Sequence, residues 1–133
     1  MGYTIERLPG ASVWVVRGQG EGHVGEADEI IERLRRLTTP ADQAAVLFDL
    51  RELAYIPTPA EARYIGQRYG EVGSAHGLRM AYLALPGAQY GVARTVEILS
   101  GFRGVEARVF TEETEAMAWV RQPRARSAEG GGS

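Results

Sequence analysis

The sequence predicts an α/β domain built on a mixed, mostly parallel sheet. Two strand-like segments open the chain, and strands then alternate with amphipathic helices in the order β-β-α-β-α-β-α-β-α. Strands joined through helices run parallel by right-handed crossovers, so only the first strand is expected to be antiparallel, at an edge. The chain of 133 residues has room for one domain, which we place at residues 1–122.

The first two strands are predicted to form a hairpin. Residues 3–8 alternate apolar and polar side chains, as in a strand with one wet face, and residues 12–17 form a more buried strand. Pro9-Gly10 between them is a turn signal. A glycine-rich segment, residues 18–25, leads into the first helix.

The first helix is predicted over residues 26–37, where apolar side chains recur at helical spacing. Its inward stripe is Ala27, Ile30, Ile31, Leu34 and Leu37. Pro40 ends this region because proline disfavours a helical residue before it and lacks the amide hydrogen. Residues 44–50 are apolar nearly throughout, which is typical of a central strand buried on both faces.

The second helix is predicted over residues 59–73, directly after Thr58. Thr58 and Glu61 have the spacing of a capping box, and such a cap contributes about 1 kcal/mol. The inward stripe is Ala62, Ile65, Tyr69 and Val72. Three glycines also fall within this helix: Gly66, Gly70 and Gly73. Each weakens an isolated helix by about 1 kcal/mol relative to alanine, so they either permit close packing or let the helix end fray.

The remaining predicted elements are strands at residues 78–85 and 105–110, a helix at residues 90–102, and a final helix that Thr111 is expected to cap. Their inward positions are Val92, Val96 and Leu99 on the third helix, and Ala116, Trp119 and Val120 on the fourth. Residues 123–133 have no apolar pattern and end in Gly-Gly-Gly-Ser, so they are predicted to form a disordered tail.

Composition excludes several classes of function. A net charge of −2 gives no reason to expect nucleic acid. The chain has no cysteine and no lysine, which removes disulfides, thiolate nucleophiles, Schiff-base lysines and a P-loop lysine. No apolar run approaches the roughly 20 residues of a membrane span, and no signal peptide is visible, so a cytoplasmic protein is expected.

Three local patterns occur in a suggestive order. Phe48-Asp49-Leu50-Arg51 ends a strand before a helix, Tyr90-Gly91-Val92-Ala93-Arg94 follows a strand and a Pro-Gly turn, and residues 109–120 read as a closing strand and helix. Together they resemble the SpoIIAA-like proteins of the STAS superfamily, the fold of sulphate-transporter and anti-sigma-factor-antagonist domains, also described as STAS/SEC14-like. The resemblance covers roughly residues 3–121.

This resemblance implies a four- or five-stranded sheet with helices mainly on one face. It implies a bacterial regulatory domain that contacts a protein partner, or one that binds a small or lipid-like molecule, rather than a catalyst. Thr58 falls where the family's antagonists carry a phosphorylated serine. Pro57 replaces the acid that usually precedes this serine, and Pro59 and Ala60 replace the serine and glycine that usually follow it.

The candidate site is the carboxyl edge of the sheet, because ligands and partners of open α/β sheets bind there. The candidate binding residues are Asp49, Arg51, Tyr55, Thr58, Gln89, Tyr90 and Arg94. Thr58 is either an N-cap or a phosphorylation site, and Arg94 either forms an internal salt bridge or binds an anion. No catalytic residue, cofactor or metal site is expected, since the two histidines lie on different connections.

Two further patterns have competing interpretations. Residues 20–25 match G-x-G-x-x-G, a phosphate-binding pattern, but the preceding strand is expected to be the second arm of a hairpin rather than the start of a βαβ unit. Several tyrosines either line a ligand pocket or lie half-buried with wet hydroxyls. They are Tyr55, Tyr64, Tyr69, Tyr82 and Tyr90.

We therefore expect a non-enzymatic regulatory or protein-interaction domain whose partner is an unidentified protein. The alternative is a carrier or sensor of a small amphipathic or anionic ligand at the same edge. Nucleic acid is not an expected partner. The sequence is compatible with either a monomer or a homodimer.

Overall fold

The order of the strands across the sheet follows their order along the chain. In this computed structural model, which describes residues 2–124, the strands are β1 (Tyr3–Arg7), β2 (Val13–Gly20), β3 (Ala45–Leu53), β4 (Arg79–Leu83) and β5 (Glu106–Phe110). β1 pairs with β2 antiparallel, and the other neighbouring strands pair parallel. The predicted mixed sheet with an antiparallel first strand at its edge is therefore confirmed.

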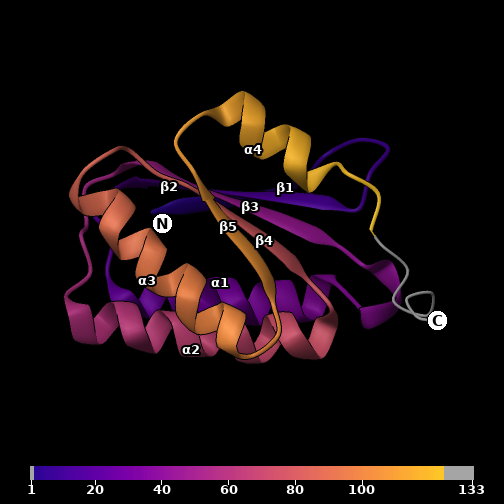
Figure 1. Ribbon diagram of the computed structural model, residues 1–133, viewed down its shortest axis with the longest axis horizontal. Coiled ribbons are helices and arrows are strands. Elements are labelled where there is room, and N and C mark those ends of the chain that lie inside the picture. Colours follow the sequence, from indigo (N-terminus) through magenta and orange to yellow (C-terminus); the bar gives the residue numbers. More distant parts are fainter. Residues whose placement is uncertain (1, 125–133) are drawn as a thin grey trace.

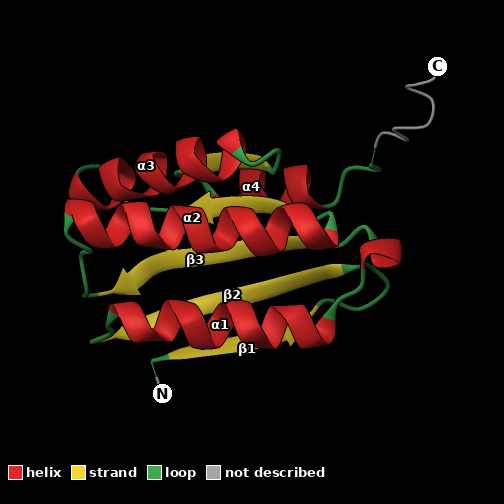
Figure 2. Ribbon diagram, turned by 90° about the horizontal axis from the view of Figure 1, so that it is seen from below, coloured by secondary structure: helices red, strands yellow, loops and turns green. Residues whose placement is uncertain are grey.

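The helices lie mainly on one face of the sheet, as expected. The structure contains α1 (Val24–Leu37), a short 3₁₀ turn at Pro40–Asp42, α2 (Pro59–His76), α3 (Ala88–Phe102) and α4 (Glu113–Val120). Figures 1 and 2 show α1, α2 and α3 side by side beneath the sheet, with α4 alone on the opposite face. The first three helices pack over one apolar core, and α4 packs over a second, smaller one.

Side chains of β3 alternate between these two cores. Val46 and Phe48 join the core under α1, α2 and α3, whereas Ala45 and Leu47 join the core under α4. All four residues are at most 3% exposed. The central strand predicted for residues 44–50, buried on both faces, is confirmed.

β2 and β3 extend further than the sequence predicted. After a register shift, their pairing continues as far as Gly20 opposite Leu53. The apolar pattern behind the prediction stops at Leu50, because the last residues of β3 are partly or fully exposed. Asp49 therefore lies within β3 rather than at its end.

The glycines of α2 permit close packing against α3. A Cβ atom at Gly66 would lie 2.8 Å from Leu99 Cβ, and one at Gly70 would lie 2.8 Å from Arg103 Cγ. The alternative that the glycines fray the helix end is wrong. Instead, α2 continues to His76 and ends at Gly77, whose φ of 62° is left-handed.

Some details of the prediction need correction. Leu37 is 41% exposed because α1 ends there, beyond the edge of the core. The N-cap of α4 is Glu112, not Thr111, and its side chain forms no capping hydrogen bond. Arg124, assigned to the tail, donates hydrogen bonds to the carbonyls of residues 43 and 44. The rest of the predicted disordered tail, residues 125–133, lies outside the described residues.

Candidate functional site

A cavity of about 100 Å³ lies between the sheet and the three helices on its larger core. Its wall includes Val16, Phe48 and Tyr82 from the sheet and Ile30, Ile65 and Val96 from the helices. One end reaches the carboxyl edge of the sheet, where His23, Leu53 and Ile56 line it near the starts of α1 and α2. The cavity thus lies at the edge where the parallel strands lead into their helices.

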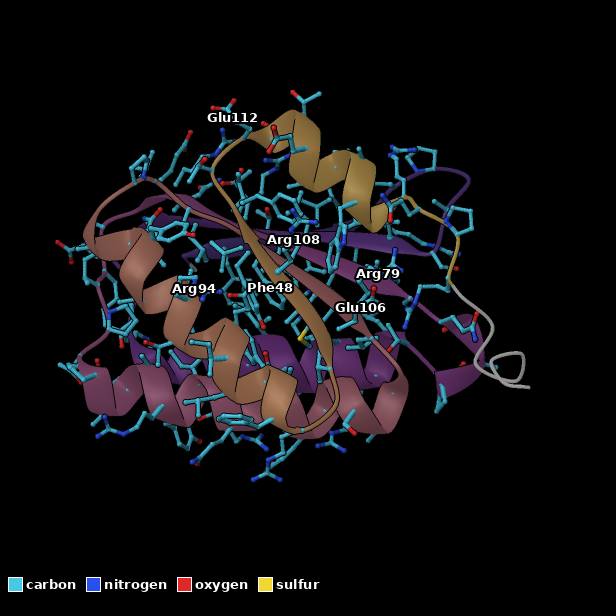
Figure 3. All side chains as sticks on the ribbon, viewed as in Figure 1. Phe48, Arg79, Arg94, Glu106, Arg108 and Glu112 are labelled. Atoms are coloured by element: carbon cyan, nitrogen blue, oxygen red, sulfur yellow. The ribbon has the colours of Figure 1, made fainter. Side chains whose placement is uncertain are left out.

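Three stacked rings form one side of this cavity. The ring of Phe48, labelled in Figure 3, is stacked on Tyr69 with ring centroids 4.9 Å apart, and on Tyr82 at 5.3 Å. Tyr69 comes from α2, whereas the other two come from neighbouring strands. Offset stacking of this kind adds roughly 0.5–1.5 kcal/mol per pair to the burial of the rings. The stack therefore fixes this side of the cavity.

Tyr55 and Gln89 are the candidate residues that line the cavity. The Tyr55 hydroxyl donates to Glu61 at 2.7 Å. Burial raises the pKa of Tyr55 most, and this hydrogen bond raises it further. The Gln89 amide nitrogen donates to the Leu50 carbonyl at 2.6 Å, and its oxygen accepts from the Leu85 amide at 2.7 Å. Gln89 thus connects the start of α3 to β3. The side chains of both Tyr55 and Gln89 already form hydrogen bonds within the protein.

Thr58 caps α2, as the capping-box interpretation predicted. Its hydroxyl accepts from the Glu61 amide at 3.2 Å, and the Glu61 carboxylate accepts from the Thr58 amide at 3.0 Å. The hydrogen bond that the Thr58 amide donates to the Glu61 carboxylate, together with that from the Tyr55 hydroxyl, holds the pKa of Glu61 below its ordinary value. A phosphate on Thr58 would gain from the helix N-terminus but would lie beside this carboxylate.

Asp49 and Arg51 lie on the opposite face of the sheet from the cavity, on the side of α4. Asp49 is 2.7 Å from Arg17 and 3.0 Å from Arg51, and Arg51 is 2.8 Å from Glu113. Burial alone would raise the pKa of Asp49, but hydrogen bonds from Arg51 and the charges of Arg51 and Arg17 outweigh it and lower that pKa. This cluster fastens the start of α4 to β2 and β3. The candidate residues therefore divide between two faces.

Tyr90 and Arg94 lie on the exposed side of α3, away from the cavity lining. Because α3 begins at Ala88, Arg94 falls in its second turn, and its guanidinium pairs with Glu97. The other oxygen of Glu97 accepts from the Val109 amide of the edge strand at 3.2 Å. Arg94 therefore forms an internal salt bridge, which was one of its two predicted roles.

The tyrosines divide between their two interpretations. Tyr55, Tyr69 and Tyr82 line the cavity. Tyr64 is 41% exposed and binds Asp28, and Tyr90 is 37% exposed. Sequence reasoning did not single out the apolar lining from β2, α1 and α3. The available signal was the alternation along β2 and β3, which places Val16 and Phe48 on the same face as the helices.

The expectation that no βαβ unit surrounds the glycine-rich segment, residues 18–25, is wrong. β2 runs parallel to β3 with α1 between them, so the segment does lie inside a βαβ unit, although β2 is also an arm of the hairpin. The loop is nevertheless filled by its own side chains. The Gly25 amide donates to the His23 ring at 3.1 Å, and Glu26 accepts from the Gly2 amide at 3.1 Å. These contacts occupy the helix start that a pyrophosphate would need.

The described part of the chain contains no group of three or more histidine, cysteine, aspartate or glutamate side chains that could hold a metal ion. Within the same residues, no helix combines the length and hydrophobicity needed to cross a membrane.

A five-stranded mixed sheet with three helices over its larger core and one helix on the opposite face is an α/β architecture similar to the SpoIIAA-like fold. The chain belongs to the SpoIIAA-like family, because the family's model matches residues 13–121. No curated protein matches the sequence significantly.

Solved structures that share the fold include the following two. An uncharacterized protein from Shewanella loihica with a SpoIIAA-like fold aligns with a TM-score of 0.59 at 18% identity, covering 89% of this chain and 91% of the other. An anti-sigma factor antagonist from Mycobacterium paratuberculosis aligns with a TM-score of 0.54 at 17% identity, covering 90% of this chain and 93% of the other. At these identities, the likeness concerns the fold.

Proposed function

We propose that this protein is a non-enzymatic binding domain that holds a small, largely apolar ligand between its sheet and α1, α2 and α3. The observation that supports this function best is the cavity of about 100 Å³ at the carboxyl edge. Its wall is mainly aliphatic and aromatic, with few polar groups, as is usual for small-molecule sites. A cytoplasmic carrier or sensor is the biological role that fits such a site.

Filling the cavity is expected to abolish ligand binding without unfolding the protein. Ala93 is 1% exposed and lines the cavity from α3, so the side chain of Ala93→Leu has space to enter. With benzene as the probe, the wild-type protein should gain about 1.4 kcal/mol of stability at ten times Kd, and the variant should gain none. Thermal unfolding with and without benzene measures the difference.

Ala118→Leu is the matched control, since Ala118 is exposed on α4 and on the other face of the sheet. It should keep the full response to benzene. Equal responses of the wild-type protein and Ala93→Leu would contradict binding in this cavity.

A second candidate function is regulation through contact with a protein partner, either another protein or a second copy of this chain. Two observations favour it: the fold is shared with an anti-sigma factor antagonist, and α3 presents exposed apolar side chains. Tyr90, Ile98 and Phe102 are 37%, 46% and 81% exposed. Large exposed apolar side chains that cluster on one surface are typical of contact sites.

If Thr58 is a phosphorylation switch in this second function, Thr58→Glu is expected to disrupt partner binding. The added carboxylate would lie close to Glu61, which already accepts the Thr58 amide hydrogen bond. Two measurements test this: phosphopeptide analysis of protein from native cells, and affinity capture of the partner with Thr58→Glu and with Thr58→Ser as the control. Capture of the same partner by Thr58→Glu and by Thr58→Ser would count against the switch.

A further inference from the structure

The Tyr69 side chain is buried, with Tyr69 only 6% exposed, but its hydroxyl has no hydrogen-bond partner within the described residues, 2–124. In the same part of the chain, no fully enclosed side-chain nitrogen or oxygen lacks a partner. The Tyr69 hydroxyl is therefore not fully enclosed by protein, and Tyr69 is one of the residues that line the cavity.

Other polar side chains of the cavity are already bonded within the protein. Gln89 holds backbone groups with its oxygen and its nitrogen. Tyr55 donates to Glu61, and Tyr82 donates to the sulfur of Met80 at 3.5 Å. Buried hydroxyls ordinarily have a hydrogen-bond partner. Tyr69 is an exception among the polar side chains that line the cavity. Its hydrogen-bonding capacity is therefore available to a molecule in the cavity that Tyr69 lines.

We propose, on the basis of the function above, that the cavity selects a neutral, compact apolar molecule carrying one hydrogen-bond acceptor, to which the Tyr69 hydroxyl donates. A carbonyl, ether or hydroxyl oxygen is the matching chemistry. The apolar body of the ligand contacts the stacked rings and the aliphatic wall, and its oxygen meets the phenol.

The charges around the cavity exclude an anionic group at this position. In the described part of the chain, no arginine lines the cavity, whereas Glu26 does. A carboxylate taken into this wall would lose its hydration and meet no arginine, which is costly. His23 also lines the cavity, but its Nδ1 atom accepts a hydrogen bond from the Gly25 amide and offers no donor there. Burial also raises the pKa of the Tyr69 phenol, so this group keeps its proton and remains a donor. Of the amphipathic and anionic ligands expected from the sequence, the cavity fits the neutral amphipathic kind.

Two probes that differ in one oxygen test this inference: cyclopentanone and cyclopentane. The quantity to compare is the ratio of their dissociation constants, measured by NMR titration of the full chain. Replacing Tyr69 by phenylalanine removes the donor and leaves the carbonyl of cyclopentanone unpaired in the cavity. We expect the preference for cyclopentanone over cyclopentane to fall about tenfold in Tyr69→Phe, with cyclopentane binding unchanged.

Tyr64→Phe is the matched control, because it makes the same substitution on α2 at a side chain that is exposed and outside the cavity. Its ratio should equal that of the wild-type protein. A ratio that is also unchanged in Tyr69→Phe, while both probes still bind, would overturn the role of Tyr69 and leave the proposed function standing. Failure of both probes to bind the wild-type protein would overturn both proposals.

A measurement on the wild-type protein makes the test independent of the variant. With tyrosine labelled at the ring carbon that carries oxygen, saturating cyclopentanone should shift the Tyr69 resonance. The resonance of Tyr64 should remain in place, and cyclopentane should produce a smaller shift at Tyr69. Identical shifts from the two probes at Tyr69 would contradict a hydrogen bond to the ligand.

Discussion

Replacing Arg79 by methionine is expected to lower the free energy of unfolding by about 2–4 kcal/mol. Its side chain is only 4% exposed, at the start of β4. The guanidinium donates to Glu106 at 3.1 Å and to the carbonyls of Trp119 and Gln122 at 3.0 and 3.1 Å. Figure 3 shows Arg79 and Glu106 close together on the neighbouring strands β4 and β5.

The physical reason for this large effect is that Arg79 satisfies the end of α4. The last carbonyls of a helix have no partner within the helix, and here a buried cation supplies one. The same guanidinium lies 5.0 Å from the centre of the Trp119 ring. Methionine retains the bulk of the stem but removes three hydrogen bonds donated by a buried charge, and hydrogen bonds from charged groups contribute more than neutral ones. The Trp119 carbonyl then keeps the Gln122 amide as a donor.

Urea denaturation measures the loss, with Arg63→Met as the control. Arg63 is exposed on α2 and takes part in no salt bridge of the described chain, so its replacement should change stability by less than about 0.5 kcal/mol. A loss below about 1 kcal/mol for Arg79→Met would show that α4 is held by its apolar contacts alone.

Arg79 also illustrates what local sequence patterns leave out. The pattern of residues 78–85 correctly predicted a strand, found as β4 at Arg79–Leu83, but nothing in it marks the arginine as buried. Its partners lie 27 to 43 residues further along the chain. The order of strands and helices was predictable because the spacing of apolar residues within each element indicates its type. The pairing of Arg79 with distant residues depends instead on how the folded elements pack against one another.

Asp49 shows a different limit. The sequence correctly placed it in a strand, but at the strand's carboxyl end, whereas β3 continues to Leu53. It was then grouped with Thr58 because both were assigned to the carboxyl edge of the sheet. The period of two in a strand already separates Asp49 from Phe48 by face. The structure confirms this separation, since Phe48 lines the cavity and Asp49 joins the cluster with Arg17 beneath α4. The position of a residue along the strand and the face of the sheet on which its side chain lies together predict a site better than its position at the carboxyl edge alone.

The cavity itself has no signature in the sequence. It exists because the stacked rings and the surrounding aliphatic side chains do not fill the space between the sheet and the helices. Side-chain volumes decide this only once the helix positions are fixed, and these depend on the close approach of α2 and α3 at Gly66 and Gly70. The predicted stripes therefore identified most of the core, with Leu37 as an exception, without locating the gap in it.

Phe48→Ala is expected to have the largest effect of any single substitution considered, a loss of about 3–5 kcal/mol. Phe48 is 2% exposed and contributes its ring to both close stacking pairs, with Tyr69 and with Tyr82. The substitution removes the buried ring and joins the space it occupied to the existing cavity. Urea denaturation measures the loss in the absence of ligand.

Because the enlarged space is apolar, benzene should restore part of this stability. Engineered apolar cavities stay dry and bind benzene, and any ligand that binds only the folded state stabilises it. The expected result is that saturating benzene raises the thermal unfolding temperature of Phe48→Ala by more than that of the wild-type protein. The ligand cavity and the core of the domain would then be one continuous structure.

Leu47→Ala is the control that separates this effect from a general response of a weakened protein. Leu47 is the neighbouring residue of β3 and is completely buried, but it faces α4 on the other side of the sheet. Its replacement should cost about 2–5 kcal/mol, and benzene should stabilise it no more than the wild-type protein, since the new gap does not join the cavity. If benzene stabilises Leu47→Ala as strongly as Phe48→Ala, the cavity between the sheet and the three helices is not the site where it binds.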